Sequence, residues 1–197
     1  MPPEVQDLET PVLLLAMPQV QDPFFAHSVV LLLHHNDEGS FGFIANRPTE
    51  IPVAEILDRL EIEWRGEVDL KAFFGGPVQP QLGTVLYDSA SGDEEGAASA
   101  ATEVVPGLKL SQQVTDLQRL ARRPPRRFRF FLGYAGWGEG QLVGEILRND
   151  WLTAPVREDL LFGDDSGKAW SAALASVGVD PATLPSWTEA QDAEGAN

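Results

Sequence analysis

Leu132-Gly133-Tyr134-Ala135-Gly136-Trp137-Gly138-Glu139-Gly140-Gln141-Leu142 is the most informative stretch of this chain, with four glycines and two large aromatic residues between Gly133 and Gln141. An apolar, strand-like run precedes it, and a helix-like run follows it. Glycine adopts positive φ angles without steric cost, so a tight passage from strand to helix favours it. The stretch therefore predicts a strand-to-helix turn of fixed shape that holds Tyr134 and Trp137 in place.

Apolar patterns along the rest of the chain predict further strands and helices. The strands are expected at Val12–Ala16, Ser28–His35, Ser40–Asn46, Leu70–Phe74, Gly83–Tyr87 and Arg127–Tyr134. The helices are expected at Val53–Ile62, Gln113–Ala121, Gly138–Asn149 and Lys168–Val177. The polar turn Asn36-Asp37-Glu38-Gly39 joins two of the strands as a hairpin. This mixed order of strands and helices predicts an α+β fold in one domain.

The predicted domain covers residues 1–185, and two segments have the composition of flexible chain. Ser89–Thr102 is small, polar and acidic, which is typical of a loop. Residues 186–197 are predicted to form a flexible tail, because chain ends are poorly ordered unless they are tied down.

Composition limits the classes of protein to which this chain can belong. The 197 residues are 43% hydrophobic, which is ample for a core, and none is cysteine. The missing cysteines exclude disulfides, thiolate metal sites and a cysteine nucleophile. No run approaches the roughly 18–20 apolar residues of a membrane helix, and Pro11–Met17 is too short for a signal peptide. We therefore expect a soluble cytoplasmic protein with no membrane partner.

Charge disfavours nucleic acid as a partner. Thirty acidic and fourteen basic residues give a net charge of −16, which repels phosphates. No helix-turn-helix pattern is recognisable, so we expect no direct DNA binding. One basic cluster departs from this balance and comprises Arg119, Arg122, Arg123, Arg126, Arg127 and Arg129. It is either a docking patch for an anion or acidic partner, or a solvated helix end, which is the ordinary interpretation of like-charge runs.

Four blocks of residues carry a resemblance to a known family. They are Ala16-Met17-Pro18 with Gln21-Asp22-Pro23-Phe24-Phe25 and Ser28-Val29-Val30; His35-Asn36 with Glu38-Gly39 and Gly42-Phe43-Ile44-Ala45-Asn46-Arg47-Pro48; Phe74-Gly75-Gly76-Pro77-Val78; and the opening stretch, followed by Asn149, Trp151-Leu152, Leu160-Leu161-Phe162, Trp170 and Gly178-Val179-Asp180. In this order they resemble the YqgE/AlgH family of bacterial proteins over nearly the full length. The resemblance implies a split or barrel-like mixed β-sheet surrounded by helices in one compact domain, and no settled function.

The polar pair Asn46-Arg47 is the first candidate for ligand binding. Pro48 forces Arg47 into an extended conformation at the end of a predicted strand. The planar guanidinium of Arg47 can bind a carboxylate or phosphate through two hydrogen bonds. The alternative is an internal partner, for example Asp22 or Glu50, and Asn46 can likewise satisfy backbone groups.

Five residues are expected to converge on one patch, because strand ends are where loops gather and sites form. They are Asn46, Arg47, Tyr134, Trp137 and Gln141. Trp137 is also expected to be buried against a neighbouring element, for example the Gly75-Gly76-Pro77 turn. The backbone amides of Gly75 and Gly76 are secondary candidates for binding an anion, although Pro77 supplies no N–H.

Catalytic and metal-binding arrangements are weak in this sequence. His34 and His35 are adjacent in a predicted strand and so point to opposite faces, which predicts no metal site, and no cofactor is implied. Asp22 and His35 are the secondary polar candidates, and a Ser28–His35–Asp22 set lacks any feature that orients it. The sequence favours a non-enzymatic binding or regulatory module for a small ligand or protein partner. The alternative is an enzyme of hydrolase or transferase type.

Overall fold

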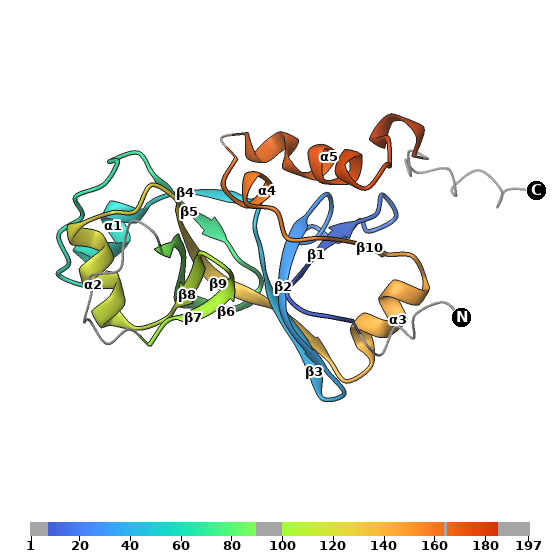
Figure 1. Ribbon diagram of the computed structural model, residues 1–197, viewed down its shortest axis with the longest axis horizontal. Coiled ribbons are helices and arrows are strands. Elements are labelled where there is room, and N and C mark those ends of the chain that lie inside the picture. The colour runs from blue at the N-terminus through green and yellow to red at the C-terminus, as the bar shows by residue number, and fades with distance from the viewer. Residues whose placement is uncertain (1–7, 90–99, 164, 185–197) are drawn as a thin grey trace, which may run out of the picture.

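The long strand β9 (Phe128–Gly138) organises the sheet in the computed structural model, which describes residues 8–89, 100–163 and 165–184 (Figure 1). The first half of β9 pairs in parallel with β5 (Lys71–Phe74) and antiparallel with β6 (Val78–Asp88). Its second half pairs antiparallel with β3 (Gly39–Ile44). The chain therefore uses one strand to join two groups of strands.

The remaining strands extend the sheet on both sides of β9. On the β3 side lie β2 (Val29–Asn36), β1 (Val12–Ala16) and the edge strand β10 (Trp151–Ala154). On the β6 side lie β8 (Leu108–Ser111) and β7 (Thr102–Val105), while β4 (Pro48–Pro52) pairs with β5. Together, the 10 strands of the described residues form a curled, largely antiparallel half-barrel.

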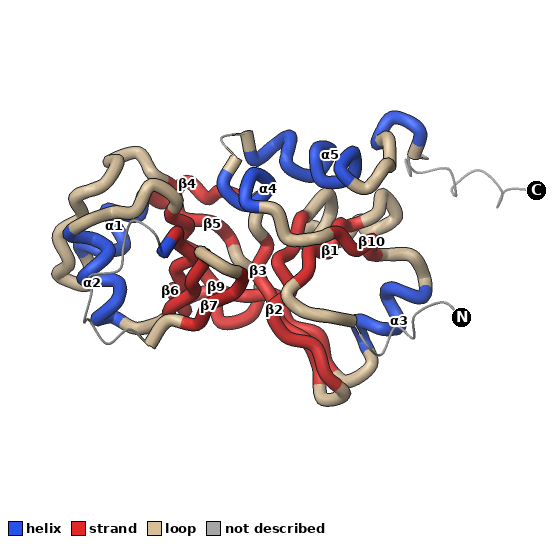
Figure 2. The backbone as a smooth tube through the Cα atoms, in the orientation of Figure 1, coloured by secondary structure: helices blue, strands red, loops and turns tan. Residues whose placement is uncertain are grey.

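Helices lie around the sheet rather than within it (Figure 2). α1 (Val53–Asp58) and α2 (Val114–Arg122) lie at one end of the molecule, and α3 (Gln141–Leu147) lies at the other (Figure 1). α4 (Glu158–Phe162) and α5 (Ser166–Ser176) run along one side and are followed by a short 3₁₀ turn, Pro181–Thr183. The predicted single α+β domain, with helices surrounding a mixed sheet, is confirmed.

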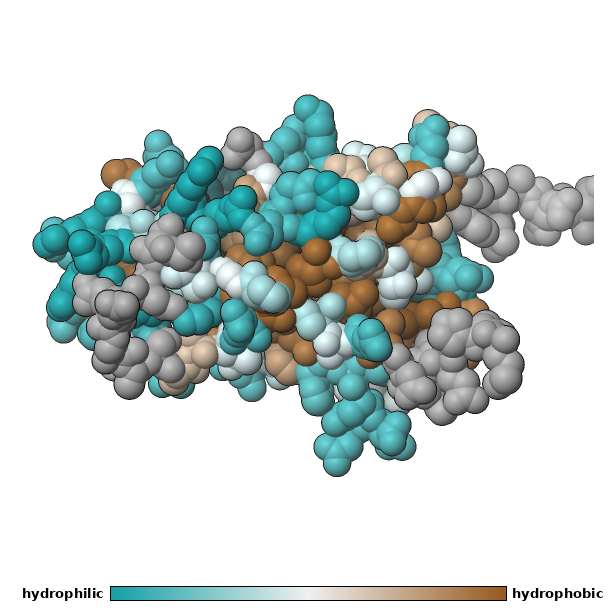
Figure 3. All heavy atoms as spheres, in the orientation of Figure 1, coloured by the Kyte–Doolittle hydropathy of each residue, from teal (hydrophilic) through white to brown (hydrophobic). Residues whose placement is uncertain are grey.

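Three apolar clusters form the core between sheet and helices. One joins β1 and β2 to α4 and α5, and it includes Leu13, Leu31 and Leu174. The second lies beneath α1 and α2, and the third lies beneath α3 around Trp137 and Trp151. Figure 3 shows hydrophobic side chains gathered across the middle of one face and toward its right side, with hydrophilic side chains at its left end.

The predicted strand-to-helix turn is wrong for most of the opening stretch. Gly136 and Gly138 belong to β9, because they pair with Phe41 and Gly39 across the ladder. The passage to α3 is confined to the two residues that follow, and Gly140 takes a left-handed conformation with φ +66°. Glycine occurs both in turns and in strands that another backbone approaches closely, and the sequence alone did not distinguish these two cases.

Several other boundaries differ from prediction. β1 and α2 lie where predicted, to within a residue, whereas α1 ends at Asp58 and not at Ile62. The strands β4, β7, β8 and β10 were not predicted, since they are short and β4 contains two prolines. Most of the predicted loop Ser89–Thr102 and the whole of the predicted tail 186–197 lie outside the described residues. Within the described part, no helix is long and apolar enough to span a membrane.

Candidate functional site

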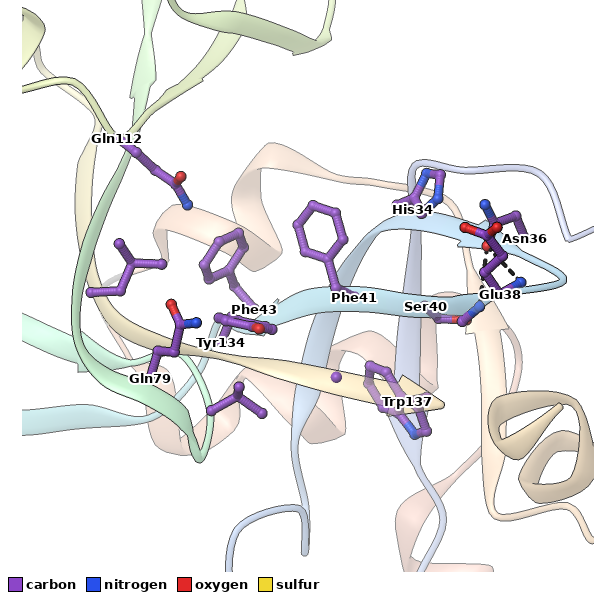
Figure 4. Close-up of a pocket in the computed structure, with 14 residues that line it drawn as sticks. His34, Asn36, Glu38, Ser40, Phe41, Phe43, Gln79, Gln112, Tyr134 and Trp137 are labelled. Atoms are coloured by element: carbon purple, nitrogen blue, oxygen red, sulfur yellow. Dashed lines mark hydrogen bonds between the residues drawn. The ribbon is translucent and has the colours of Figure 1, made fainter. Parts of the chain in front are cut away.

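A groove of about 630 Å³ opens between β3, β9 and the start of β6, and we call it the aromatic groove (Figure 4). It is lined by His34, Asn36, Glu38, Gly39, Ser40, Phe41, Phe43, Val78, Gln79, Leu82, Gln112, Tyr134, Gly136 and Trp137. Aromatic rings form much of the surface of this groove, and amide side chains form part of its border. Grooves of this size with apolar floors and few polar groups are the usual form of a ligand site.

Phe41 lies at the centre of the rings in the aromatic groove. Its ring centroid is 6.1 Å from that of His34, 6.4 Å from that of Phe43 and 6.3 Å from that of Tyr134. The contacts with Phe43 and Tyr134 are edge-to-face, which is a favoured aromatic geometry. Phe41 nevertheless remains 37% exposed, so part of its ring is open to solvent.

Polar side chains border these rings at both ends. Gln79 and Gln112 lie on the β6 side, with their amides directed toward the rings (Figure 4). The Gln112 amide also donates to the Thr84 hydroxyl at 3.1 Å. At the other end, the Asn36 side chain accepts hydrogen bonds from the backbone N–H groups of Glu38 and Gly39, which fixes the tip of the hairpin.

A wide bulge in β6 shapes one wall of the aromatic groove. Val78 pairs with Tyr134 and Gly83 pairs with Leu132, so residues 79–82 leave the ladder between these two positions. Gly133 makes room for the bulge: its φ is +70°, and a Cβ there would lie 2.4 Å from the Gly76 carbonyl oxygen. Bulges of this kind re-aim side chains and are common beside functional sites.

The predicted candidates Gly75 and Gly76 pack against β9. A Cβ at Gly75 would lie 2.3 Å from the Gly133 carbonyl oxygen, and one at Gly76 would lie 2.2 Å from the Tyr134 backbone. The two glycine segments of the sequence therefore meet each other. Trp137 is buried, as predicted, and its ring packs against the rings of Phe25 and Trp151.

Asn46 and Arg47 hold the turn that contains Phe25. The Arg47 guanidinium donates to the carbonyl oxygens of Pro23 at 2.5 Å and Ala26 at 2.9 Å. The Asn46 side chain accepts from the Val29 N–H and donates to the His27 carbonyl. Neither side chain lines the aromatic groove. The partners of Arg47 are carbonyl oxygens rather than the acidic residues considered from the sequence.

Trp137 and Gln141 meet at Glu145, on α3. The Trp137 and Trp151 indoles both donate to one carboxylate oxygen of Glu145, at 2.8 and 2.7 Å, and Gln141 donates to the other at 3.0 Å. A cavity of about 300 Å³ beside this cluster includes Asp22 in its lining. Of the five main candidates, only Tyr134 and Trp137 line the aromatic groove, and Gln141 lies with Trp137 in this second cavity.

His35 pairs with a residue of the aromatic groove. Its Nδ1 lies 2.7 Å from the hydroxyl oxygen of Ser40, which is the residue opposite it in the β2–β3 ladder. His35 has no carboxylate partner in the part of the chain that the structure describes. Among those same residues, no three His, Cys, Asp or Glu side chains are grouped as a metal site would require.

Three arginines of the basic cluster have partners within the protein, and the other three are exposed to solvent. Arg127 pairs with Glu158, and Arg129 donates to the carbonyls of Leu161 and Gly163 while lying over the Phe73 ring. Arg119 pairs with Asp116 and bonds to Tyr87; burial acts to lower the pKa of Arg119, but these bonds outweigh it and raise the pKa. Arg122, Arg123 and Arg126 remain exposed.

Sequence reasoning missed Phe41, Gln79 and Gln112. Phe41 lies between Ser40 and Gly42 in β3, which pairs with β2 on one edge and with β9 on the other. The exposure of its ring depends on how these strands pair, which the sequence does not show. The signal for the bulge was Pro80 between Gln79 and Gln81, because proline within a strand marks a bulge or an edge.

Comparison with known proteins places this fold in a family. The family model described as AlgH-like, DUF179, matches residues 13–182. This chain belongs to the AlgH-like family. It is 42% identical to a UPF0301 protein of Methylococcus capsulatus, over 88% of this chain and 91% of that protein. It is 41% identical to a UPF0301 protein of Myxococcus xanthus, over 88% and 93% of the two chains.

Solved structures agree with this assignment. The solution structure of the AlgH protein from Pseudomonas aeruginosa superposes with a TM-score of 0.70 at 33% identity, over 91% of this chain and 92% of that chain. A crystal structure of a Corynebacterium diphtheriae protein shares the fold, with a TM-score of 0.69 at 22% identity, over 84% and 85%. The AlgH-like fold is thus established for this chain, and the resemblance seen in the sequence is confirmed.

Proposed function

We propose that this AlgH-like protein is a non-enzymatic, cytoplasmic binding module whose ligand site is the aromatic groove. The observation that carries the proposal is Phe41, a large ring that is 37% exposed although three other rings surround it. An exposed ring on rigid strands offers a binding surface that loses little conformational entropy when a ligand covers it.

Charge supports an uncharged or cationic ligand. Among the described residues that line the aromatic groove, Glu38 and His34 are the only acidic or basic side chains, and no lysine or arginine lines it. The net charge of −16 also repels anions from the whole surface. A nucleotide or another phosphorylated ligand would find no lysine or arginine among the described residues that line the groove.

A thermal-shift screen against a library of uncharged and cationic metabolites tests the proposal. A ligand that binds only the native state raises Tm by mass action. We expect Phe41→Ala to abolish the shift produced by the wild-type ligands. Phe24→Ala is the matched control, because Phe24 is 44% exposed and stacks on Phe74 outside the aromatic groove. Equal shifts for wild type and Phe41→Ala would show that ligands bind elsewhere.

A hydrolase is the second candidate, and the 2.7 Å contact between His35 and Ser40 favours it. A serine within hydrogen-bond reach of a histidine is the minimum that nucleophilic catalysis requires. Against it, Ser40 is only 8% exposed and no third group orients His35 in the described chain. Turnover of p-nitrophenyl esters that Ser40→Ala abolishes would favour the hydrolase, whereas equal background rates would favour the binding module.

A further inference from the structure

A smaller cavity continues the aromatic groove beyond the β6 bulge, and we call it the side cavity. It has a volume of about 170 Å³, and Leu82 and Gln112 line both spaces. Leu60 and Val114 line its far part and are 50% and 53% exposed. An apolar surface therefore runs from Phe41 past Leu82 toward α1 and α2.

Primary amides accompany this surface along its length. Gln79 and Gln112 line the aromatic groove, and Gln81, Gln112 and Gln113 line the side cavity. An amide side chain both donates and accepts, as a peptide group does. Among the described residues that line the side cavity, none is acidic or basic.

We propose that the aromatic groove and the side cavity together bind one extended peptide segment of a partner protein. Alternate side chains of an extended peptide point to the same face, so successive apolar residues would reach Phe41, Leu82 and Val114. The glutamine amides would bond to the peptide backbone between these positions, as in other modes that read extended segments. This inference rests on the proposed function and names the ligand class.

Charge complementarity selects the partner. Glu38 lies at the hairpin end of the surface, and the chain carries a net charge of −16. A segment with a lysine or arginine at that end is attracted, and an acidic segment is repelled. The same charge disfavours a second copy of this chain as the occupant, since two copies repel each other.

An array of synthetic octapeptides tests this inference on the full chain. Apolar residues alternate with threonine in every peptide, and each is made with lysine, threonine or glutamate at its first position. We expect binding in the order lysine, threonine, glutamate, and fluorescence anisotropy of the best peptide gives its Kd. Glu38→Gln should remove the preference for lysine over threonine.

Variants at the two ends show whether one peptide spans both spaces. Phe41→Ala and Val114→Ser should each weaken binding about tenfold, which is the usual effect of truncating a residue that contributes strongly to an interface. Val68→Ser is the matched control, because Val68 is 75% exposed and lines neither space, and its Kd should equal that of wild type. Methylation of the peptide backbone nitrogens should also weaken binding, since it removes the N–H groups from which the glutamine side-chain oxygens would accept hydrogen bonds.

The outcomes separate this inference from the proposed function. If Val114→Ser behaves like Val68→Ser while Phe41→Ala weakens binding, the ligand does not reach the side cavity and the peptide inference is wrong. The same holds if no peptide binds but small molecules raise Tm through Phe41, in which case the aromatic groove remains a ligand site. If neither peptides nor small molecules depend on Phe41, both proposals fail.

Discussion

Trp137 contributes to stability through both its ring and its indole N–H. It is 6% exposed, packs against Phe25 and Trp151, and donates to Glu145 at 2.8 Å. We expect Trp137→Ala to lower the free energy of unfolding by about 3–5 kcal/mol, the usual cost of deleting a buried large ring. Urea unfolding followed by circular dichroism measures the change. Trp137→Phe is the control, because it keeps a ring, and it should cost less.

Gly133 and Gly140 have nearly the same backbone conformation in different surroundings. Their φ angles are +70° and +66°, but a Cβ at Gly133 would lie 2.4 Å from the Gly76 carbonyl oxygen, whereas a Cβ at Gly140 would meet no atom of a non-neighbouring residue within 4 Å. We expect Gly140→Ala to cost about 1–2 kcal/mol from the left-handed conformation alone. Gly133→Ala should cost clearly more in the same urea experiment. Equal losses of unfolding free energy for the two variants would mean that the segment facing Gly133 shifts to admit the added methyl group at no energetic cost.

Asn46 shows which part of the site the sequence could indicate. It was identified as a polar residue at a strand end, with the satisfaction of backbone groups as one interpretation, and it bonds to the backbone of Val29 and His27. A side chain that holds a turn and one that binds a ligand have the same residue type. Only the positions of its partners separate the two roles, and these are set by segments elsewhere in the chain.

At the scale of single elements, Arg47 ties the turn of residues 22–27 to the sheet. Arg47→Ala removes two hydrogen bonds from a charged donor, and such bonds contribute roughly 1.5–3 kcal/mol each. Because the bond to Pro23 is exposed to solvent and the bond to Ala26 only partly buried, we expect a smaller total loss of about 2 kcal/mol. Tryptophan fluorescence should also change, because the turn places Phe25 5.9 Å from the Trp137 ring.

The control for this prediction is Arg59→Ala. Arg59 pairs with Glu55 at 2.6 Å, but both side chains are more than half exposed, and such pairs contribute little. We expect its unfolding curve and fluorescence to match those of wild type. An Arg47→Ala protein that also matched wild type would show that the turn is held by its other contacts.

The elements with regular apolar patterns were predictable, and those defined by their neighbours were not. The buried run of β1 specifies a strand by itself, and it was predicted with its exact bounds. In contrast, β10 has four residues and becomes a strand by pairing with β1. The end of β9 was taken for a turn because glycine suits both, and its pairing with β3 settles the matter.

At the scale of the whole molecule, the aromatic groove arises from register. Phe41 belongs to β3, Tyr134 to β9 and Gln79 to the bulge of β6, so three separate segments meet there. The sequence identified Tyr134 and Trp137, and Pro80 was a signal for the bulge that carries Gln79. It did not indicate Phe41, because a one-residue change in pairing moves a side chain to the opposite face.

Net charge governs what the whole molecule can bind, and we expect no specific binding to duplex DNA. The charge of −16 repels phosphates, and several arginines of the basic cluster already have partners within the protein. Arg127 and Arg129 already bind Glu158 and the carbonyls of Leu161 and Gly163. Anisotropy with a pool of labelled duplexes at about 150 mM salt should give Kd values weaker than about 1 µM, far above those of specific complexes.

Salt dependence and a charge-reversal variant make this test decisive. Contacts with phosphates strengthen steeply as salt falls, so any residual binding near 20 mM salt should disappear by about 150 mM. Arg122→Glu combined with Arg126→Glu removes two of the exposed bases from the cluster. A sequence-specific, submicromolar complex at the higher salt, lost in this double variant, would contradict the prediction and make the cluster a nucleic-acid site. If binding is weak and the double variant leaves it unchanged, the basic cluster does not contact DNA, as expected for a solvated helix end.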